Sequence, residues 1–198
     1  MQQEEIQFTT FHSTRDAGWR EAWEIYTEAF PENERWSEDR YAEALANDPL
    51  LTADGILLDG KIVGIIFHWR TPCSEYIEHF AVSSDYRNRK LGARILEAMC
   101  KRYSSMILEI EEPVDELTRR RAAFYRRHGF IPSDRYGYIH PSYHKPFQEF
   151  PLKLVAYPTA PSWEEAVDVA DFVRTHLLPR YSDHTDPTLP VALCAEVD

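Results

Sequence analysis

The middle of the chain contains a stretch that could bind an anion. Residues 76–96, YIEHFAVSSDYRNRKLGARIL, run from an apolar segment through a basic turn with one glycine into an amphipathic segment. This pattern predicts a strand, a turn and the start of a helix. The first N–H groups of a helix have no acceptor within it and lie at the positive end of its dipole, where phosphates bind. Because Arg87, Arg89 and Lys90 stand in the same turn, we expect a site for linked phosphates.

The strand before this turn carries a carboxylate that could move a proton. Tyr76, Glu78, Phe80 and Val82 share one face by the strand period of two, and His79 lies on the other. Apolar neighbours can raise the pKa of Glu78 toward neutrality, as a general base requires. Glu78 could instead pair with an arginine, or hold a cationic group without taking its proton. His79 is expected to be a packed histidine.

Composition indicates an ordinary soluble globular protein with an uneven distribution of charge. The 198 residues are 43% hydrophobic and 28% charged, and no apolar run approaches the roughly 20 residues of a membrane span. The segment MQQEEIQFTT has no features of a secretory signal, so we expect a cytoplasmic protein.

The net charge is −11, yet residues 87–127 hold eleven basic and six acidic residues. This basic island favours an anionic cofactor at one place and a cationic substrate at another, although solvated helix faces are an alternative explanation. The acidic remainder argues against membrane and nucleic-acid partners. Nucleic-acid binding through the island is a weak rival, because no aromatic residues interleave with its charges.

Neither the cysteines nor the histidines show the spacing of a metal site. Cys73, Cys100 and Cys194 are widely spaced without a CxxC pair, so we expect reduced thiols, with a nucleophilic role for one as the alternative. His140 and His144 are four residues apart, but Pro141 and the loop context remove the helical geometry that this spacing would need. We therefore predict no metal.

The apolar periodicity and the turn signals predict a mixed α/β fold. Ser37, Thr118 and Ser162 are candidate helix caps, Gly129 a helix stop, and Asp59-Gly60 a hairpin turn. A mixed sheet with helices on both faces is expected, in which a crossover makes strands four and five parallel. The expected strands are 6–12, 51–58, 61–69, 75–82, 106–110, 131–138 and 151–157, and the expected helices are 15–30, 38–50, 91–103, 119–128 and 163–178.

Two of these segments together resemble the GNAT superfamily of N-acetyltransferases. The family's diphosphate motif, Gln/Arg-x-x-Gly-x-Gly/Ala after a strand ending in valine, corresponds to RNRKLG at residues 87–92. Its aromatic-Tyr pair shortly before Gly-Phe corresponds to FYRRHGF at residues 124–130. The resemblance covers roughly residues 6–157. It implies a GNAT-like central mixed sheet with splayed fourth and fifth strands, a single acyl-CoA N-acyltransferase domain over 1–178, and an irregular tail over 179–198.

The resemblance also implies direct acetyl transfer from acetyl-CoA, a co-substrate, to an amine, without a covalent acyl-enzyme and without a metal. Glu78 then corresponds to the family's usual catalytic base, and Tyr125 to the tyrosine that protonates the departing thiolate. A core tyrosine with a satisfied hydroxyl is the alternative for Tyr125. The cofactor-binding residues carried over are Phe80, Ala81 and Val82 through their main chain, Arg87, Asn88, Arg89, Lys90, Leu91, Gly92 and Ala93 at the diphosphate, and Thr118 and Phe124.

The chain departs from the family pattern at two positions. Lys90 stands where the motif has its first glycine. If that backbone needs a positive φ, the lysine costs about 1 kcal/mol or more; if it is helical, the side chain merely adds a cation, and we favour the second. Thr118 replaces an asparagine that contacts the pantetheine region in many relatives.

The acceptor is expected to be a small-molecule or peptide amine. Glu32 and Glu34 beside Trp36 could attract a cation, and Tyr76 is a further candidate contact. The rival to an enzyme is a module of the same fold that binds acyl-CoA without chemistry. We expect a monomer or a homodimer.

Overall fold

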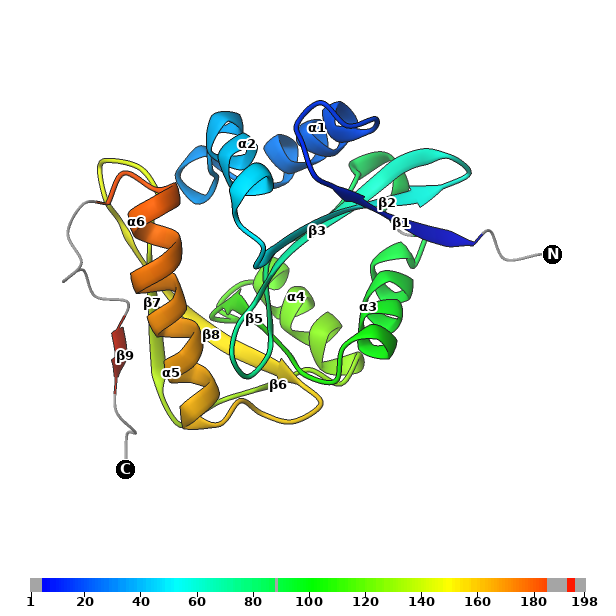
Figure 1. Cartoon of the computed structure of the whole chain (residues 1–198). Helices are drawn as coiled ribbons and strands as arrows, with labels where there is room; N and C mark the ends of the chain where they lie inside the picture. Colours follow the sequence, from blue (N-terminus) through cyan, green and yellow to red (C-terminus); the bar gives the residue numbers. More distant parts are fainter. Residues whose placement is uncertain (1–4, 88, 185–191, 195–198) are drawn as a thin grey trace. The chain divides into compact units, whose positions relative to one another are not determined.

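The computed structural model describes residues 5–87, 89–184 and 192–194 (Figure 1). Its contacts divide the chain into two compact units. The first unit comprises Met1–Arg70 and Ile77–Arg102, and the second comprises Thr71–Tyr76 and Tyr103–Asp198. None of the helices in the described part is both long and apolar enough to cross a membrane.

The first unit contains four neighbouring strands in the order β1-β2-β3-β4, with helices before and after them. Strand β1 pairs antiparallel with β2, and β2 pairs antiparallel with β3. Asp59 and Gly60 join β2 to β3 with φ values of 50° and 75°, which confirms the predicted hairpin turn. The elements of this unit are β1 (Ile6–Phe11), α1 (Trp19–Ala29), η1 (Glu32–Glu34), α2 (Glu38–Asn47), β2 (Leu51–Leu58), β3 (Lys61–Arg70), β4 (Glu75–Val82), η2 (Ser84–Tyr86) and α3 (Leu91–Arg102).

Helices cover both faces of the first unit's strands, as predicted. Phe67 of β3 lies opposite Ala53 of β2, and its ring stacks on Trp19 of α1 at 6.1 Å. The next residue of β2, Asp54, must point to the other face. Its buried carboxylate binds Arg102 at the end of α3 at 3.2 Å. The apolar face therefore holds α1, and the opposite face anchors α3.

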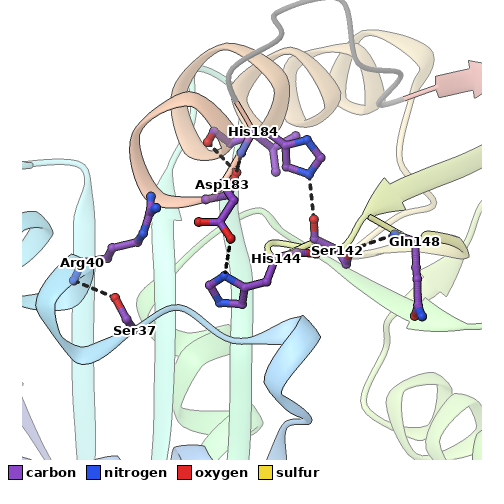
Figure 2. A network of polar contacts seen from close by, with 9 residues as sticks. Ser37, Arg40, Ser142, His144, Gln148, Asp183 and His184 are labelled. Atoms are coloured by element: carbon purple, nitrogen blue, oxygen red, sulfur yellow. Dashed lines mark hydrogen bonds and ion pairs between the residues drawn. The ribbon is translucent and has the colours of Figure 1, made fainter. Parts of the chain in front are cut away.

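Helix α2 begins as the sequence predicts. Ser37 has an extended backbone, and its hydroxyl accepts a hydrogen bond from the backbone N–H of Arg40 (Figure 2). Helix α1 begins later than predicted, at Trp19, because Gly18 before it has a φ of 88° and the Asp16 carboxylate holds the preceding turn.

The second unit contains the strand order β5-β8-β7-β9, with β6 also paired to β8. Glu75, in the part of β4 that belongs to this unit, donates its N–H to the Ser105 carbonyl just before β5 at 3.1 Å. This bond joins the start of β4 to the residue before β5, as expected if the predicted crossover makes the two strands parallel. The elements are β5 (Met106–Glu111), α4 (Glu116–Arg127), β6 (Ile131–Pro132), β7 (Gly137–Pro141), β8 (Glu149–Tyr157), α5 (Trp163–Phe172), η3 (Val173–Leu177), α6 (Leu178–Tyr181) and β9 (Ala192–Cys194).

Three boundaries in the second unit differ from the predictions. Asp115, not Thr118, caps α4: its carboxylate accepts from the N–H of Thr118, and the Thr118 hydroxyl accepts from the N–H of Asp115. The single strand expected at 131–138 is two short strands, because β6 ends at Pro132. Beyond the last predicted helix, α6 runs to Tyr181 and β9 pairs with β7, so the tail is not wholly irregular.

The segment after α6 is held against the loop between β7 and β8 (Figure 2). Asp183 donates its backbone N–H to the Tyr143 carbonyl and its carboxylate lies 3.2 Å from Nδ1 of His144. Nε2 of His184 lies 2.7 Å from the Ser142 carbonyl. Because the carbonyl can only accept, Nε2 donates, and burial lowers the pKa of the His184 ring.

Replacing Asp54 tests the anchor of α3. Asp54→Ala removes the acceptor for the Thr10 hydroxyl and the partner of Arg102, and should lower the free energy of unfolding by about 2–4 kcal/mol. Asp171→Ala, which breaks an ion pair with Arg174 between two solvent-accessible side chains, is the matched control and should cost at most about 0.5 kcal/mol. Urea unfolding measures both, and equal losses would contradict a special role for Asp54.

Candidate active site

The residue before α3 has a left-handed backbone. Lys90 has a φ of 58°. In the described part of the chain, Lys90 and Asp59 are the two non-glycine residues with positive φ. The prediction that Lys90 is helical is therefore wrong, and the alternative holds. A side chain in this region is strained by roughly 1–2 kcal/mol, which explains why the family motif has glycine at this position.

The left-handed residue turns the chain into a helix whose first amides are open. The Lys90 carbonyl accepts the first intrahelical bond, from the N–H of Arg94 at 3.2 Å. The N–H groups of Leu91, Gly92 and Ala93 precede that bond, and among the described residues no side chain or carbonyl accepts from them. These three amides lie at the positive end of a 12-residue helix, a geometry that suits an anion, and their role in binding one stays a prediction.

The cations of the turn are exposed around these amides. Arg87 is exposed with an extended backbone, and its N–H donates to the Ser84 carbonyl. The guanidinium of exposed Arg89 lies 5.0 Å from the centre of the Tyr86 ring, a cation–π contact that restrains it. Asn88, also expected in this site, lies outside the described residues.

The strand leading to the turn is close to a glycine on its neighbour. A Cβ built on Gly64 of β3 would lie 2.8 Å from the Ala81 carbonyl oxygen, so only glycine fits without a shift of backbone. Phe80, Ala81 and Val82, the residues predicted to contact pantetheine through their main chain, are half-buried. Their role as cofactor contacts stays a prediction.

Glu78 is a buried carboxylate with a fixed donor. Its side chain is 2% exposed, and Nε1–H of Trp69 on β3 donates to Oε2 at 2.7 Å. The sequence does not indicate Trp69, because the period of two gives faces of a strand but not cross-strand partners. A carboxylate buried among aromatic rings is suited to take or hold a proton, as the base hypothesis requires.

His79 is packed, as predicted, yet it is not remote from Glu78. Its ring lies edge-on to Tyr26 and Phe30 at 4.9 and 4.7 Å. Its Nδ1 lies 3.3 Å from the Tyr41 hydroxyl, and 3.7 Å from Oε2 of Glu78.

The neighbouring Tyr26 keeps its proton. Burial, above all, and the charge of Glu78 raise the pKa of Tyr26 far above its ordinary value.

Tyr125 of α4, in the second unit, has a buried side chain. Its ring packs on Phe124 and Phe130, and no described residue is hydrogen-bonded to its hydroxyl. Burial raises the pKa of Tyr125 to about 12, with a smaller raising effect from Glu111 and a lowering one from Arg121. The hydroxyl therefore keeps its proton at neutral pH, as a general acid must.

The other predicted cofactor residues of α4 have mixed surroundings. The Thr118 hydroxyl is already engaged with Asp115 in the helix cap, so it offers little to a pantetheine amide. Phe124 is half-buried, with its ring 4.9 Å from His128. Arg121 forms an ion pair with Glu111, which removes it from the set of cations open to phosphates.

The residues predicted for the acceptor do not form one exposed patch. Glu32 and Glu34 are exposed on η1, whereas Trp36 is 2% exposed, with its ring stacked on Tyr41 at 4.7 Å. Tyr76, which belongs to the second unit, is buried and donates its hydroxyl to Glu109 at 2.9 Å. Their role toward a substrate stays a prediction.

A surface cavity of about 850 Å³ lies beside η2 in the first unit. Glu21, Glu24 and Glu28 of α1 line one side, and Asp85 lines another. This acidic lining is unsuited to phosphates.

The described cysteines lack the environment of a nucleophile. Hydrogen bonding to Asp168 and burial raise the pKa of Cys73 to about 11, and burial raises the pKa of Cys100. A thiol with a raised pKa is a poor nucleophile. Within the described ranges, no three His, Cys, Asp or Glu side chains gather as a metal site.

Comparisons with known proteins agree with this geometry. Residues 52–132 match the family model described as the acetyltransferase (GNAT) domain. No curated protein matches the chain. A GNAT-family protein from Bacteroides thetaiotaomicron has a similar structure, with a TM-score of 0.77 and 27% identity over 84% of this chain and 96% of its own.

Two more distant structures share the fold. The ribosomal-protein-S18-alanine N-acetyltransferase from Escherichia coli is 18% identical over 81% of this chain and 97% of its own, with a TM-score of 0.54. A GNAT family acetyltransferase from Elizabethkingia anophelis, solved with acetyl-CoA bound, is 16% identical over 78% of this chain and 98% of its own, with a TM-score of 0.52.

The mixed α/β fold, the open helix start after β4 and the family match over residues 52–132 agree with one another. Residues 52–132 thus match a GNAT acetyltransferase domain, and the fold is similar to that of GNAT acetyltransferases, one of them solved with acetyl-CoA bound.

Proposed function

We propose that this protein moves the acetyl group of acetyl-CoA directly to a primary amine. The observation that supports this most is the start of α3, where three amides have no acceptor among the described residues and Arg87, Arg89 and Lys90 are exposed in the turn before them. CoA carries a diphosphate, and a helix start with added cations suits its charge. A module that binds acyl-CoA without chemistry would need the same anion site but no proton-transferring groups.

The proposed roles follow from the chemistry of amide formation. A protonated amine cannot attack, so Glu78 accepts the proton of the acceptor's ammonium group, or holds that group while it loses the proton. The neutral amine then attacks the thioester carbonyl, and main-chain groups of residues 80–82 hold the pantetheine arm. When the C–S bond breaks, Tyr125 gives its proton to the thiolate.

The acceptor class is proposed from the charge of the first unit. Glu78 is buried among aromatic side chains, including Trp69, which donates to it. A carboxylate with aromatic neighbours attracts a cationic amine. Glu32 and Glu34 of η1 add negative charge, and the backbone carbonyl of Glu34 contacts the His79 ring.

A panel of amines decides between the enzyme and the binding module. The wild-type protein is incubated with acetyl-CoA and each amine, from small diamines to peptides with a free N-terminus, and free thiol is measured. Amine-dependent thiol release supports the enzyme. Binding of acetyl-CoA without thiol release for any amine would favour the non-catalytic module.

Tyr125→Phe tests the proton donor. Because the pKa of Tyr125 is about 12, the hydroxyl stays protonated through neutral pH, and its loss should lower kcat by roughly 10²-fold with little change in the Kd of acetyl-CoA. The same pKa predicts no basic limb from this residue below about pH 11. Tyr136→Phe, which removes a hydroxyl that donates to the Pro161 carbonyl outside the predicted site, is the control and should leave kcat unchanged. Unchanged kcat in Tyr125→Phe would remove the residue from the chemistry.

Lys90→Gly separates backbone strain from charge. Glycine relieves the left-handed strain, so the free energy of unfolding should rise by about 0.5–1 kcal/mol. The lost ammonium group should weaken CoA binding several-fold at low salt. Asp59→Gly, at the other left-handed residue, is the control and should leave CoA affinity unchanged. If Lys90→Gly were both less stable and equally tight for CoA, the account of this turn would be wrong.

A further inference from the structure

A buried carboxylate and a buried imidazole lie next to each other on β4. Oε2 of Glu78 is 3.7 Å from Nδ1 of His79, and the two side chains are 2% and 4% exposed. Few ionisable pairs are so completely removed from water, and charge interactions between such groups are much stronger than at a surface. Their protonation states must therefore depend on each other.

The hydrogen bonds of His79 define its neutral tautomer. Nε2 lies 3.2 Å from the backbone carbonyl of Glu34, which can only accept, so Nε2 carries a proton. In the neutral ring, Nδ1 then has a lone pair. The Tyr41 hydroxyl, 3.3 Å away, can donate to it.

In this tautomer Nδ1, which can accept from the Tyr41 hydroxyl, carries no proton and lies 3.7 Å from Oε2 of the Glu78 carboxylate. With neither group protonated, the lone pair and the negative charge repel each other in a medium of low dielectric constant. A proton between Oε2 and Nδ1 removes the repulsion, either as a carboxylic acid beside a neutral ring or as a carboxylate beside an imidazolium. Burial of the two side chains therefore favours the state in which the pair holds one proton over the state in which it holds none.

The remaining groups around the pair orient it. Trp69 of β3 donates to Oε2 and so favours the carboxylate form. Tyr26 and Phe30 hold the imidazole ring edge-on from α1 and the residue after it. The titratable groups that contact the pair from the packed elements are Tyr26 of α1 and Tyr41 of α2, and the charge of Arg35 after η1 acts on Tyr26.

We propose that Glu78 and His79 form one proton-accepting pair, in which His79 is the positioning residue that makes Glu78 a stronger base. The proposal rests on the proposed function for its role in catalysis. In the step, an N–H bond of the acceptor's ammonium group breaks, and the electron pair stays on nitrogen. The proton bonds to Glu78 and is shared with Nδ1 of His79, and it returns to solvent when the products leave.

The pair is tested first without catalysis. NMR of the protein with ¹⁵N-labelled histidine and ¹³C-labelled glutamate follows both groups as pH changes. In the wild type, the Glu78 carboxyl and the His79 ring should respond in the same pH transitions. In Glu78→Gln, the His79 ring should take its proton at a pH lower by about one unit or more, because its negative partner is gone. An His79 titration that is the same in both proteins would overturn the pair.

The second test uses the pH profile of kcat/KM. His79→Gln should move the acidic limb to lower pH by about one unit and lower kcat at neutral pH, because Glu78 becomes a weaker base. His12→Gln, a histidine at an exposed position after β1, should change neither. An unchanged limb in His79→Gln would contradict the proposal. If the wild type releases no thiol with any amine, the proposed function fails, and the NMR comparison still decides whether the pair exists.

Discussion

The left-handed backbone at Lys90 is the constraint on which the candidate site depends. It lets the chain leave η2 and enter α3 so that the first amides of the helix remain without acceptors in the described protein. In a helix that begins with a side-chain cap, one of those amides donates to the capping side chain and is not open to a ligand. The strain at this lysine therefore belongs to the site, because it keeps the amides open while it adds a cation beside them.

The rest of the first unit holds this helix start in place. Asp54 fixes the end of α3 through Arg102, on the face of the strands opposite to α1. Gly64 lets β3 approach the backbone of β4 at Ala81, immediately before the turn. Asp54 and Gly64 lie outside the proposed phosphate site, and their roles concern the position and stability of the elements around it.

The sequence predicts features that are local and fails at those that depend on distant partners. The Asp59-Gly60 hairpin, the caps at Ser37 and Ser162, and the stop at Gly129 are confirmed, because each is encoded by a few adjacent residues. Thr118 was wrongly predicted as a cap, since Asp115 offers the better acceptor three residues earlier.

The candidate site shows the same division between local and distant signals. A motif indicates residues 87–93 as a candidate site, but it does not indicate the positive φ of Lys90, because side-chain type alone favours a helical lysine. Trp69 and Tyr41, which contact Glu78 and His79, come from other elements and carry no motif. The sequence does not show which residues of neighbouring strands lie opposite each other, as the structure does for β2 and β3.

The most direct test of the central claim is calorimetry of the wild-type protein with CoA and, separately, with pantetheine, which lacks the diphosphate. If the open amides and cations at the start of α3 bind linked phosphates, CoA should bind at least about tenfold more tightly than pantetheine, and raised salt should narrow the difference. Equal affinities for the two ligands, or no binding heat with CoA, would contradict the account.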